Sequence, residues 1–186
     1  WGENLPYASI VDRRHLFFQE ALAVPPELKP RNTVVYSDFG FWHLQNILER
    51  RFQLTLDRLA HDWVWSKIPD SRLHYRPVRM DSAGERYRIA ATGEKVAMTE
   101  YCPWRGLLQG QVHDDNSWSM GGVSGHAGVF GRLKDVTGWV HALFDGVFVS
   151  GRTLRTFTKE VSEPVGARRT YGFDMVSLDG NGSTAN

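Results

Sequence analysis

The chain has 186 residues, enough for one domain with a hydrophobic core, and its 41% apolar and 23% charged content is ordinary for a globular protein. The net charge of +1 gives no electrostatic argument for a nucleic-acid partner, and no apolar run of roughly 18 residues indicates a membrane span. The 7 Trp, 10 Phe and 6 Tyr suit a core or a groove lined with aromatic rings.

The first half of the chain is expected to be mainly helical. Apolar residues near helical spacing predict a helix over residues 12–23, and the prolines of VPPELKP then impose an extended or turning path. A stronger helix is predicted over residues 38–51, and another over residues 55–67 with Thr55 as its N-cap. In the 38–51 helix the expected apolar face is Phe41, Leu44, Ile47 and Leu48, with Gln45, Glu49 and Arg50 on another face.

The second half is expected to combine loops, two helices and the beginning of a sheet. Residues 69–101 are loop-rich, with short extended pieces at best. Helices are predicted over residues 133–146, where Gly146 is a natural stop, and over residues 152–161. The alternation in RRTYGFDMVSL, residues 168–178, predicts a strand. The expected apolar face of the 133–146 helix is Val136, Val140 and Leu143.

The two ends and the single cysteine say little about activity. Cys102 excludes an internal disulfide, and its segment TEYCPWRG offers no neighbouring histidine to activate a catalytic thiol. The chain begins with Trp1 rather than Met, carries no signal segment and ends in the polar stretch SLDGNGSTAN. We therefore expect a fragment or a processed chain.

The glycine-dense segment GLLQGQVHDDNSWSMGGVSGHAGVFG, residues 106–131, predicts several backbone positions with positive φ or close backbone approach. A phosphate-binding loop is not indicated, because the G-x-x-x-x-G-K-[ST] pattern is absent. A Ser-His-Asp triad built on Ser124 is conceivable. However, GVSGH is one residue out of register with the G-x-S-x-G esterase turn, and no strand precedes it.

A metal site is another interpretation of this segment. The candidate ligands are His113, Asp114, Asp115 and His126, whose side chains suit zinc or another divalent ion. The adjacent Asp114 and Asp115 cannot both readily face one ion, and HDDN is also good turn sequence. The favoured alternative is structural, with His113 and Asp114 hydrogen-bonding a long loop together.

The stretch VYSDFG raises a similar choice. Ser37 and Asp38 are helix-cap residue types, so one interpretation is a capped helix start. The other is that a reaction requires Tyr36 and Asp38 at this helix N-terminus. A phenol with an ordinary pKa of about 10 acts as a base near neutrality only beside cations or strong donors, so Tyr36 would need a lysine from elsewhere. Otherwise Tyr36 would be a core tyrosine with a satisfied hydroxyl.

Three segments together resemble a known superfamily. YSDFGFWHLQNILERRFQLTLDRLAHDWVW resembles the tyrosine-motif helix of the serine beta-lactamase and penicillin-binding protein superfamily, in the class C-like branch that includes esterases and D-alanyl-D-alanine carboxypeptidases. The pair V-H-D-x-N and G-G-V-x-G-H-A-G looks like the long segment of that branch, and YGFDM resembles the strand that follows. The match spans roughly residues 30–175.

The resemblance implies a fold and a mechanism. The fold is α+β and beta-lactamase-like: a helical region plus part of a flanked antiparallel sheet, helix-dominated here, with residues 1–186 forming one partial domain. In the mechanism a serine of a Ser-x-x-Lys motif attacks a carbonyl to form an acyl-enzyme, which water hydrolyses. The motif lysine and the motif tyrosine share the proton transfers, and no cofactor is implied.

Only part of this machinery lies in the chain. Tyr36 matches the catalytic tyrosine, and Asp38 stands in a substrate-binding position where the pattern often has Asn. An aspartate there could pair with the motif lysine, and it puts the usual amide donor to substrate in doubt. The chain contains neither Ser-x-x-Lys nor Lys-Thr-Gly or His-Thr-Gly. We therefore expect this chain alone to be inactive.

Three functional hypotheses remain open. The first is a fragment of a serine hydrolase that acts on beta-lactams, esters or D-alanyl peptides. The second is a non-catalytic binding or interaction module derived from that fold, and the third is a metal-dependent hydrolase using His113 and His126. The resemblance suggests a periplasmic or secreted protein with a small-molecule, peptide or ester substrate. The substrate itself cannot be read from groove details in one sequence.

Overall fold

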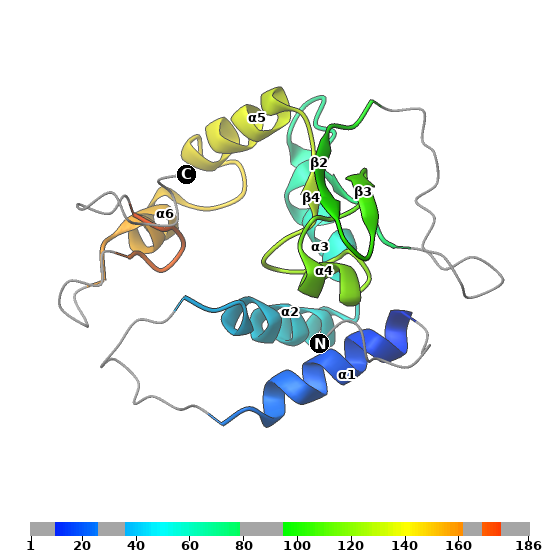
Figure 1. Ribbon diagram of the computed structural model, residues 1–186. Coiled ribbons are helices and arrows are strands. Elements are labelled where there is room, and N and C mark those ends of the chain that lie inside the picture. The colour runs from blue at the N-terminus through cyan, green and yellow to red at the C-terminus, as the bar shows by residue number, and fades with distance from the viewer. Residues whose placement is uncertain (1–9, 26–35, 79–94, 162–168, 176–186) are drawn as a thin grey trace.

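The computed structural model describes residues 10–25, 36–78, 95–161 and 169–175, which form a helix-rich α+β structure (Figure 1). Its helices are α1 (Ile10–Ala23), α2 (Phe39–Phe52), α3 (Leu56–Trp63), α4 (Asp115–Ser119), α5 (Leu133–Phe144) and α6 (Gly151–Thr158), with a 3-10 turn at Trp65–Lys67. Its strands are β1 (His74–Tyr75), β2 (Met98–Cys102), β3 (Gly106–Gln109) and β4 (Val129–Phe130). Among these residues, each helix lacks the length or the apolar character that a membrane span requires.

The strands of the described residues form two small antiparallel pairs. In the first, His74 of β1 lies opposite Phe130 of β4, and Tyr75 lies opposite Val129. The second is the β2–β3 hairpin, whose register is irregular after Met98. The β1–β4 pair joins segments distant in sequence, so it fixes the end of the glycine-dense segment next to α3 and the turn that follows it (Figure 1).

Helices α1 and α2 pack against each other through aromatic rings. The rings of Phe17 and Trp42 meet edge to face, with 5.0 Å between their centroids. Phe18, Ala21 and Met120 complete this buried cluster. Because Met120 follows α4, the same cluster holds the glycine-dense segment against the helix pair.

The predicted helices occur close to their expected positions, with one break. The helix expected over residues 55–67 is divided, because Val64 has φ −123° and ψ −66°, outside the helical region. The chain turns at this point into the 3-10 turn, where Trp65 is buried and packs 5.5 Å from the ring of Tyr75. The aromatic contact therefore favours a turn where the apolar spacing predicted a continuous helix.

The face of α2 that is buried is not the one predicted. Leu44 and Ile47, expected in the core, are 57% and 61% exposed, and Phe41 is exposed as well. Gln45, expected on a polar face, is only 1% exposed and lies beside the buried Trp42. The prediction was wrong because the partner of α2 is a polar backbone segment, which a glutamine can hydrogen-bond and a leucine cannot.

Helix α5 shows the same difference in part. Leu143 is buried as predicted, whereas Val136 and Val140 are exposed. They lie in an apolar stripe along the described surface of the helix, consisting of Leu133, Val136, Val140 and Phe144. Gly146 takes a positive φ of 76° after the helix, which agrees with its predicted role as a stop.

The strand predicted over residues 168–178 is not seen in the described part of that range, residues 169–175. Two isolated bridges occur instead, Glu160 with Thr170 and Arg169 with Asp174. The hydroxyl of Thr170 accepts hydrogen bonds from the backbone N–H groups of Gly172 and Phe173, which closes a tight turn. A local side-chain turn has replaced the extended strand.

Candidate functional site

Tyr36 lies on the surface immediately before α2. Its side chain is 71% exposed, which rules out the alternative of a core tyrosine. The guanidinium of Arg169 lies over the phenol ring, 5.6 Å from the ring centroid. The cation beside this tyrosine therefore comes from the C-terminal part of the chain, a contact that the sequence did not predict.

Asp38 is at the N-cap position of α2 but does not cap the helix with its side chain. The local hydrogen bond is made by Ser37, whose hydroxyl accepts from the backbone N–H of Phe39 at 3.2 Å. The backbone carbonyl of Asp38 accepts from the N–H groups of Phe41 and Trp42. The side-chain cap interpretation therefore fails for the carboxylate of Asp38, while Ser37 forms a local turn just before the helix.

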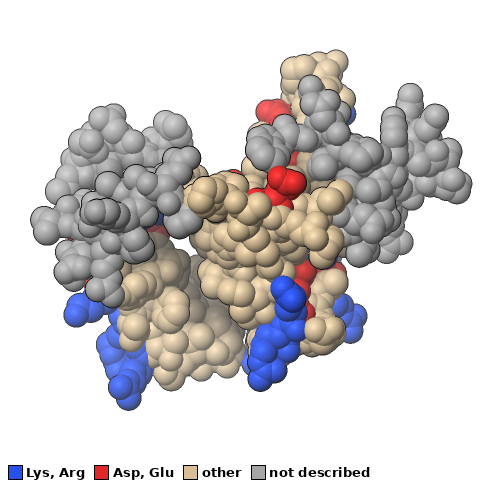
Figure 2. All heavy atoms as spheres, turned by 90° about the horizontal axis from the view of Figure 1, so that it is seen from below, with Lys and Arg blue, Asp and Glu red and all other residues tan. Residues whose placement is uncertain are grey.

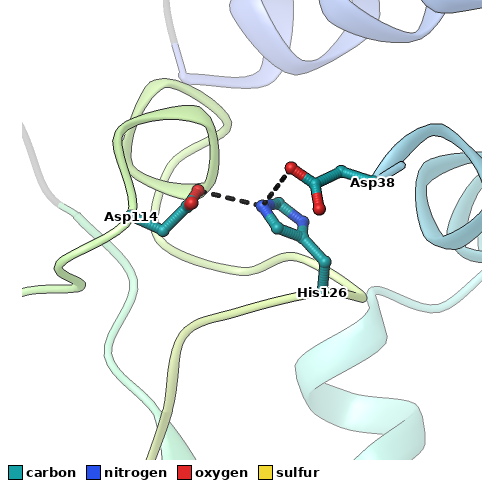
Figure 3. A group of neighbouring side chains, drawn as sticks. All are labelled: Asp38, Asp114 and His126. Atoms are coloured by element: carbon teal, nitrogen blue, oxygen red, sulfur yellow. Dashed lines mark hydrogen bonds and ion pairs between the residues drawn. The ribbon is translucent and has the colours of Figure 1, made fainter. Parts of the chain in front are cut away.

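The Asp38 carboxylate instead faces His126, together with a second carboxylate from Asp114 (Figure 3). His126 Nε2 lies 2.9 Å from Asp114 Oδ1 and 3.8 Å from Asp38 Oδ2. Asp38 precedes α2, Asp114 precedes α4, and His126 belongs to the glycine-dense segment between α4 and β4. The start of α2 and two points of the glycine-dense segment thus meet at one imidazole that is almost fully buried.

The hydrogen bonds of His126 define its tautomer. The indole Nε1–H of Trp42 donates to His126 Nδ1 at 3.0 Å, and an indole nitrogen can only donate. The hydroxyl of Ser124 lies 2.7 Å from the same Nδ1. Nδ1 is therefore an acceptor, and the ring proton is assigned to Nε2, which donates it toward Asp114.

The side chain of Asp114 accepts two hydrogen bonds that hold its loop in place. Its side chain caps α4 by accepting from the backbone N–H of Ser117 at 2.7 Å, and it accepts the proton of His126. The hydrogen bond from His126 lowers the pKa of Asp114 below its ordinary value, with help from the Ser117 N–H and against the opposing effect of burial. This confirms the expected role of Asp114 in holding the loop together.

The other proposed metal ligands point elsewhere. His113 pairs with Glu100 at 3.0 Å, and Asp115 pairs with Arg105 at 2.6 Å. The geometry therefore separates His113 from His126 and contradicts the metal hypothesis in the form that used both.

Asp38, Asp114 and His126 could together surround a cation, since their ligand atoms lie within 4.8 Å of one another. The tautomer argues against a metal. A neutral imidazole that accepts at Nδ1 carries its proton on Nε2, which is the atom that faces both carboxylates. In this state His126 offers no lone pair to an ion at that position.

Ser124, His126 and Asp114 also have the connectivity of a Ser-His-Asp triad. The triad needs a serine that can reach a substrate, and Ser124 is 0% exposed. Its Nδ1 partner also accepts from Trp42, and its own carbonyl accepts from the hydroxyl of Tyr75 at 3.0 Å. We interpret this chain of hydrogen bonds as a buried support and not as a nucleophilic centre.

The glycine-dense segment is tied to α2 by a buried glutamine. Gln45 Nε2 donates to the carbonyl of Val123 at 3.2 Å, and Gln45 Oε1 accepts from the N–H of Gly125 at 3.0 Å. Arg14 of α1 also donates to the Val123 carbonyl, at 3.3 Å. These bonds satisfy backbone groups that would otherwise be buried without partners.

Two glycines make the close approach possible. Gly122 has φ +79°, and a Cβ there would lie 2.7 Å from the carbonyl oxygen of Arg76. Gly128 has φ +112°, and its Cβ would lie 2.7 Å from the carbonyl oxygen of Gly122. Both the positive φ and the lack of room therefore require glycine, as the glycine density predicted.

An apolar pocket of about 290 Å³ lies between α1, α2 and α4. Its lining includes Phe39 and Trp42 from the first turn of α2 and Asn116 from α4. Trp42 thus lies between this pocket and the hydrogen-bonded group around His126. It lines the pocket, and its indole N–H donates to His126. Viewed from below Figure 1, the described surface is mostly tan, with Lys and Arg toward its lower part and some Asp and Glu side chains nearer its middle (Figure 2).

Sequence reasoning missed three members of this site: Trp42, Gln45 and Arg169. Trp42 stands one helical turn after Asp38, but nothing local indicated that its indole would meet a histidine 84 positions away. A usable signal did exist for Asp114 and His126, because they lie in the paired motifs V-H-D and G-H-A-G. The structure joins these motifs by one hydrogen bond.

The chain is similar to several curated proteins. It is 28% identical over 171 residues to a Salmonella gallinarum (strain 287/91 / NCTC 13346) protein described as a "putative D-alanyl-D-alanine carboxypeptidase". Proteins with the same description from Salmonella agona (strain SL483) and Salmonella typhi show the same identity. These names agree, at the level of the superfamily, with the resemblance carried by the motifs.

The match covers 86% of this chain and 38% of each of these relatives. The chain therefore spans less than half the length of the proteins it resembles. No family model matches the sequence, and no solved structure matches it. The coarse class that the fold and the relatives support is a helix-rich α+β protein similar to carboxypeptidase-type hydrolases.

Proposed function

We propose that the chain is part of a serine hydrolase that acts through an acyl-enzyme on D-alanyl peptides, esters or beta-lactams. In this proposal Tyr36 shuttles protons and Asp38 contacts the substrate. The curated relatives support the hydrolase class, and their greater length supplies room for the motifs that this chain lacks.

The observation that carries the proposal is the start of α2. Tyr36 is exposed and Asp38 is partly exposed, so both are accessible to a substrate. The Asp38 carboxylate is not used as a helix cap, which removes the simplest structural reason for an acidic residue there. The guanidinium of Arg169 lies over the phenol ring of Tyr36, 5.6 Å from its centroid, and also pairs with Asp174.

The proposed reaction follows from these groups and a serine–lysine pair supplied by the longer protein. The serine oxygen bonds to the substrate carbonyl carbon while its proton passes through the lysine and Tyr36 to the leaving amine or alcohol. The bond between the carbonyl carbon and the leaving group then breaks. Water adds to the acyl-enzyme, the same groups return a proton to the serine oxygen, and the acid is released.

The exposed apolar surfaces support the proposal that this chain is one part of a larger domain. Helices α2 and α5 present leucine, isoleucine, valine and phenylalanine side chains on the described surface, and such stripes normally pack against another element. A domain of the relatives' length contains enough additional chain to cover them.

The first test is the intact mass of the native protein from its source. A mass well above 21.2 kDa is expected, and in that protein Tyr36→Phe should lower the rate of acyl transfer by about 100- to 10,000-fold. The isolated 186-residue chain should give no acyl-enzyme burst with a penicillin reporter. A burst from the isolated chain, or full activity of Tyr36→Phe, would show that the proposal is wrong.

The alternative is a non-catalytic binding module derived from the same fold. Ser-x-x-Lys and Lys-Thr-Gly are absent from these 186 residues, as such a module would require. A native mass of 21.2 kDa would support this module, because the nucleophile would then be absent from the whole protein.

A further inference from the structure

We propose that His126 is a positioning residue that holds the carboxylate of Asp38 at the start of α2 as a hydrogen-bond acceptor for substrate. The assignment to substrate rests on the proposed function. The placement of His126 and its tautomer rest only on the contacts of this chain.

The first step is the attachment of His126 to α2. Asp38 and Trp42 are four residues apart, so their side chains project from the same face of the first turn. His126 meets both, with Nδ1 accepting from Trp42 at 3.0 Å and Nε2 lying 3.8 Å from Asp38. One imidazole therefore spans the turn that presents Asp38.

The second step is the direction of the imidazole proton. The indole N–H of Trp42 donates to Nδ1, so the imidazole N–H is on Nε2 and points to the carboxylate side. If the proton were on Nδ1, that N–H would point at the indole N–H of Trp42. The lone pair of Nε2 would then face two carboxylates. Both contacts would be repulsive, so the surroundings select a single neutral tautomer.

The third step is the unequal distance of that N–H from two carboxylates. Asp114 accepts it at 2.9 Å and also accepts from the backbone of Ser117, so its Oδ1 is fully engaged. Asp38 lies farther from the N–H and is held beside it without being saturated. Within the described residues, no hydrogen bond to the Asp38 carboxylate is found, so its lone pairs remain available to a ligand.

The consequence is a statement about substrate chemistry. A carboxylate at position 38 accepts hydrogen bonds, whereas the asparagine that often stands in the related pattern can also donate. The group of the substrate that meets Asp38 should therefore carry an N–H, as an amide does and an ester oxygen does not. A site built to pair such an N–H discriminates strongly against an analogue that lacks it.

The structural half of the proposal is tested on the 186-residue chain by ¹⁵N NMR of the His126 ring at neutral pH. The expected result is one neutral tautomer with the proton on Nε2, together with an indole N–H of Trp42 that shifts in His126→Gln. A proton on Nδ1, or a mixture of tautomers, would overturn the proposal.

Two matched variants separate positioning from general support. His126→Asn keeps an acceptor near Trp42 and loses the donor to the carboxylates, while His126→Gln keeps a donor near the position of Nε2 and loses the acceptor. We expect the carboxyl-carbon resonance of Asp38 to move in His126→Asn and to stay close to its original position in His126→Gln. Equal shifts in both variants would mean that His126 only stabilises the fold, and the proposal would fail.

The functional half is measured in the native protein with an amide substrate and its matched ester. His126→Asn should lower the amide-to-ester ratio of kcat/KM by about 10- to 100-fold, while His126→Gln should keep it within about threefold. An unchanged ratio in His126→Asn would overturn the role toward substrate. If instead Tyr36→Phe retains full activity, or the native protein shows no acyl transfer, the proposed function fails. The NMR measurements then still decide the placement of Asp38 by His126.

Discussion

The two faces of α2 differ in what they contact. The inner face carries Gln45 and Trp42, which hydrogen-bond the glycine-dense segment and are buried. The outer face carries Leu44 and Ile47, which are exposed on the described surface. The difference shows that the periodicity of a helix identifies its two faces but does not say which of them the chain itself covers. Here the polar face is buried because Gln45 hydrogen-bonds the backbone of Val123 and Gly125, which would otherwise lack partners.

The largest predicted effect comes from Gly128→Ala, which disturbs the loop that the inner face holds. The new Cβ would lie 2.7 Å from a backbone oxygen at a φ of +112°, so we expect a loss of about 4 kcal/mol in the free energy of unfolding. Urea denaturation measures it. The control is Gly40→Ala in α2, where nothing lies within 4 Å of the added Cβ and a gain of about 0.5–1 kcal/mol is expected. Similar behaviour of the two variants would contradict the tight loop packing.

Gln45→Leu tests the inner face directly. The substitution leaves the Val123 carbonyl and the Gly125 N–H without their partner, and we expect a loss of about 3 kcal/mol in the free energy of unfolding. The matched change on the outer face, Leu44→Gln, should alter stability by less than about 0.5 kcal/mol. If Gln45→Leu proved neutral in chemical denaturation, the polar contacts would not be what buries this face.

Unfolding at alkaline pH should reveal the contribution of Tyr75, whose hydroxyl donates to the carbonyl of Ser124. Burial raises the pKa of Tyr75 to about 12, above the ordinary value of about 10 that it has when unfolded. The unfolded state therefore loses this proton first, so the contribution of Tyr75 to stability is constant below pH 10 and falls by about 2–3 kcal/mol as the pH rises to 12. In Tyr75→Phe this decrease should disappear, whereas the exposed Tyr101→Phe should keep it. A decrease that survives in Tyr75→Phe would assign the titration to another group.

The smallest effect on stability is expected on the outer face. Leu44→Glu with Ile47→Glu should change the free energy of unfolding by less than about 0.5 kcal/mol, because both side chains are exposed. The same double variant should reduce self-association, since an uncovered apolar stripe favours aggregation. Sedimentation velocity measures this. A wild-type chain that is a monodisperse monomer would contradict the expected self-association.

Local sequence determined the positions of most helices. Apolar spacing located α1, α2 and α5, and the glycine density predicted the close backbone approach that Gly122 and Gly128 make. Local rules failed where a side chain or a contact competed with them. Val64 interrupts the predicted 55–67 helix, and the hydroxyl of Thr170 closes a turn in the predicted strand. The short helix α4 was missed because five residues give too little periodicity.

The sequence by itself determined that a tyrosine and an aspartate stand before an amphipathic helix, and that two motifs containing Asp114 and His126 follow downstream. Only the tertiary structure decided that Tyr36 is exposed and that the carboxylate of Asp38 faces His126 and does not cap α2. The same holds for the tautomer of His126, because a proton's place on an imidazole depends on donors that lie far away in the chain, such as Trp42. Composition and periodicity are local properties, whereas the burial of a face and the direction of a proton depend on which partners folding brings into contact.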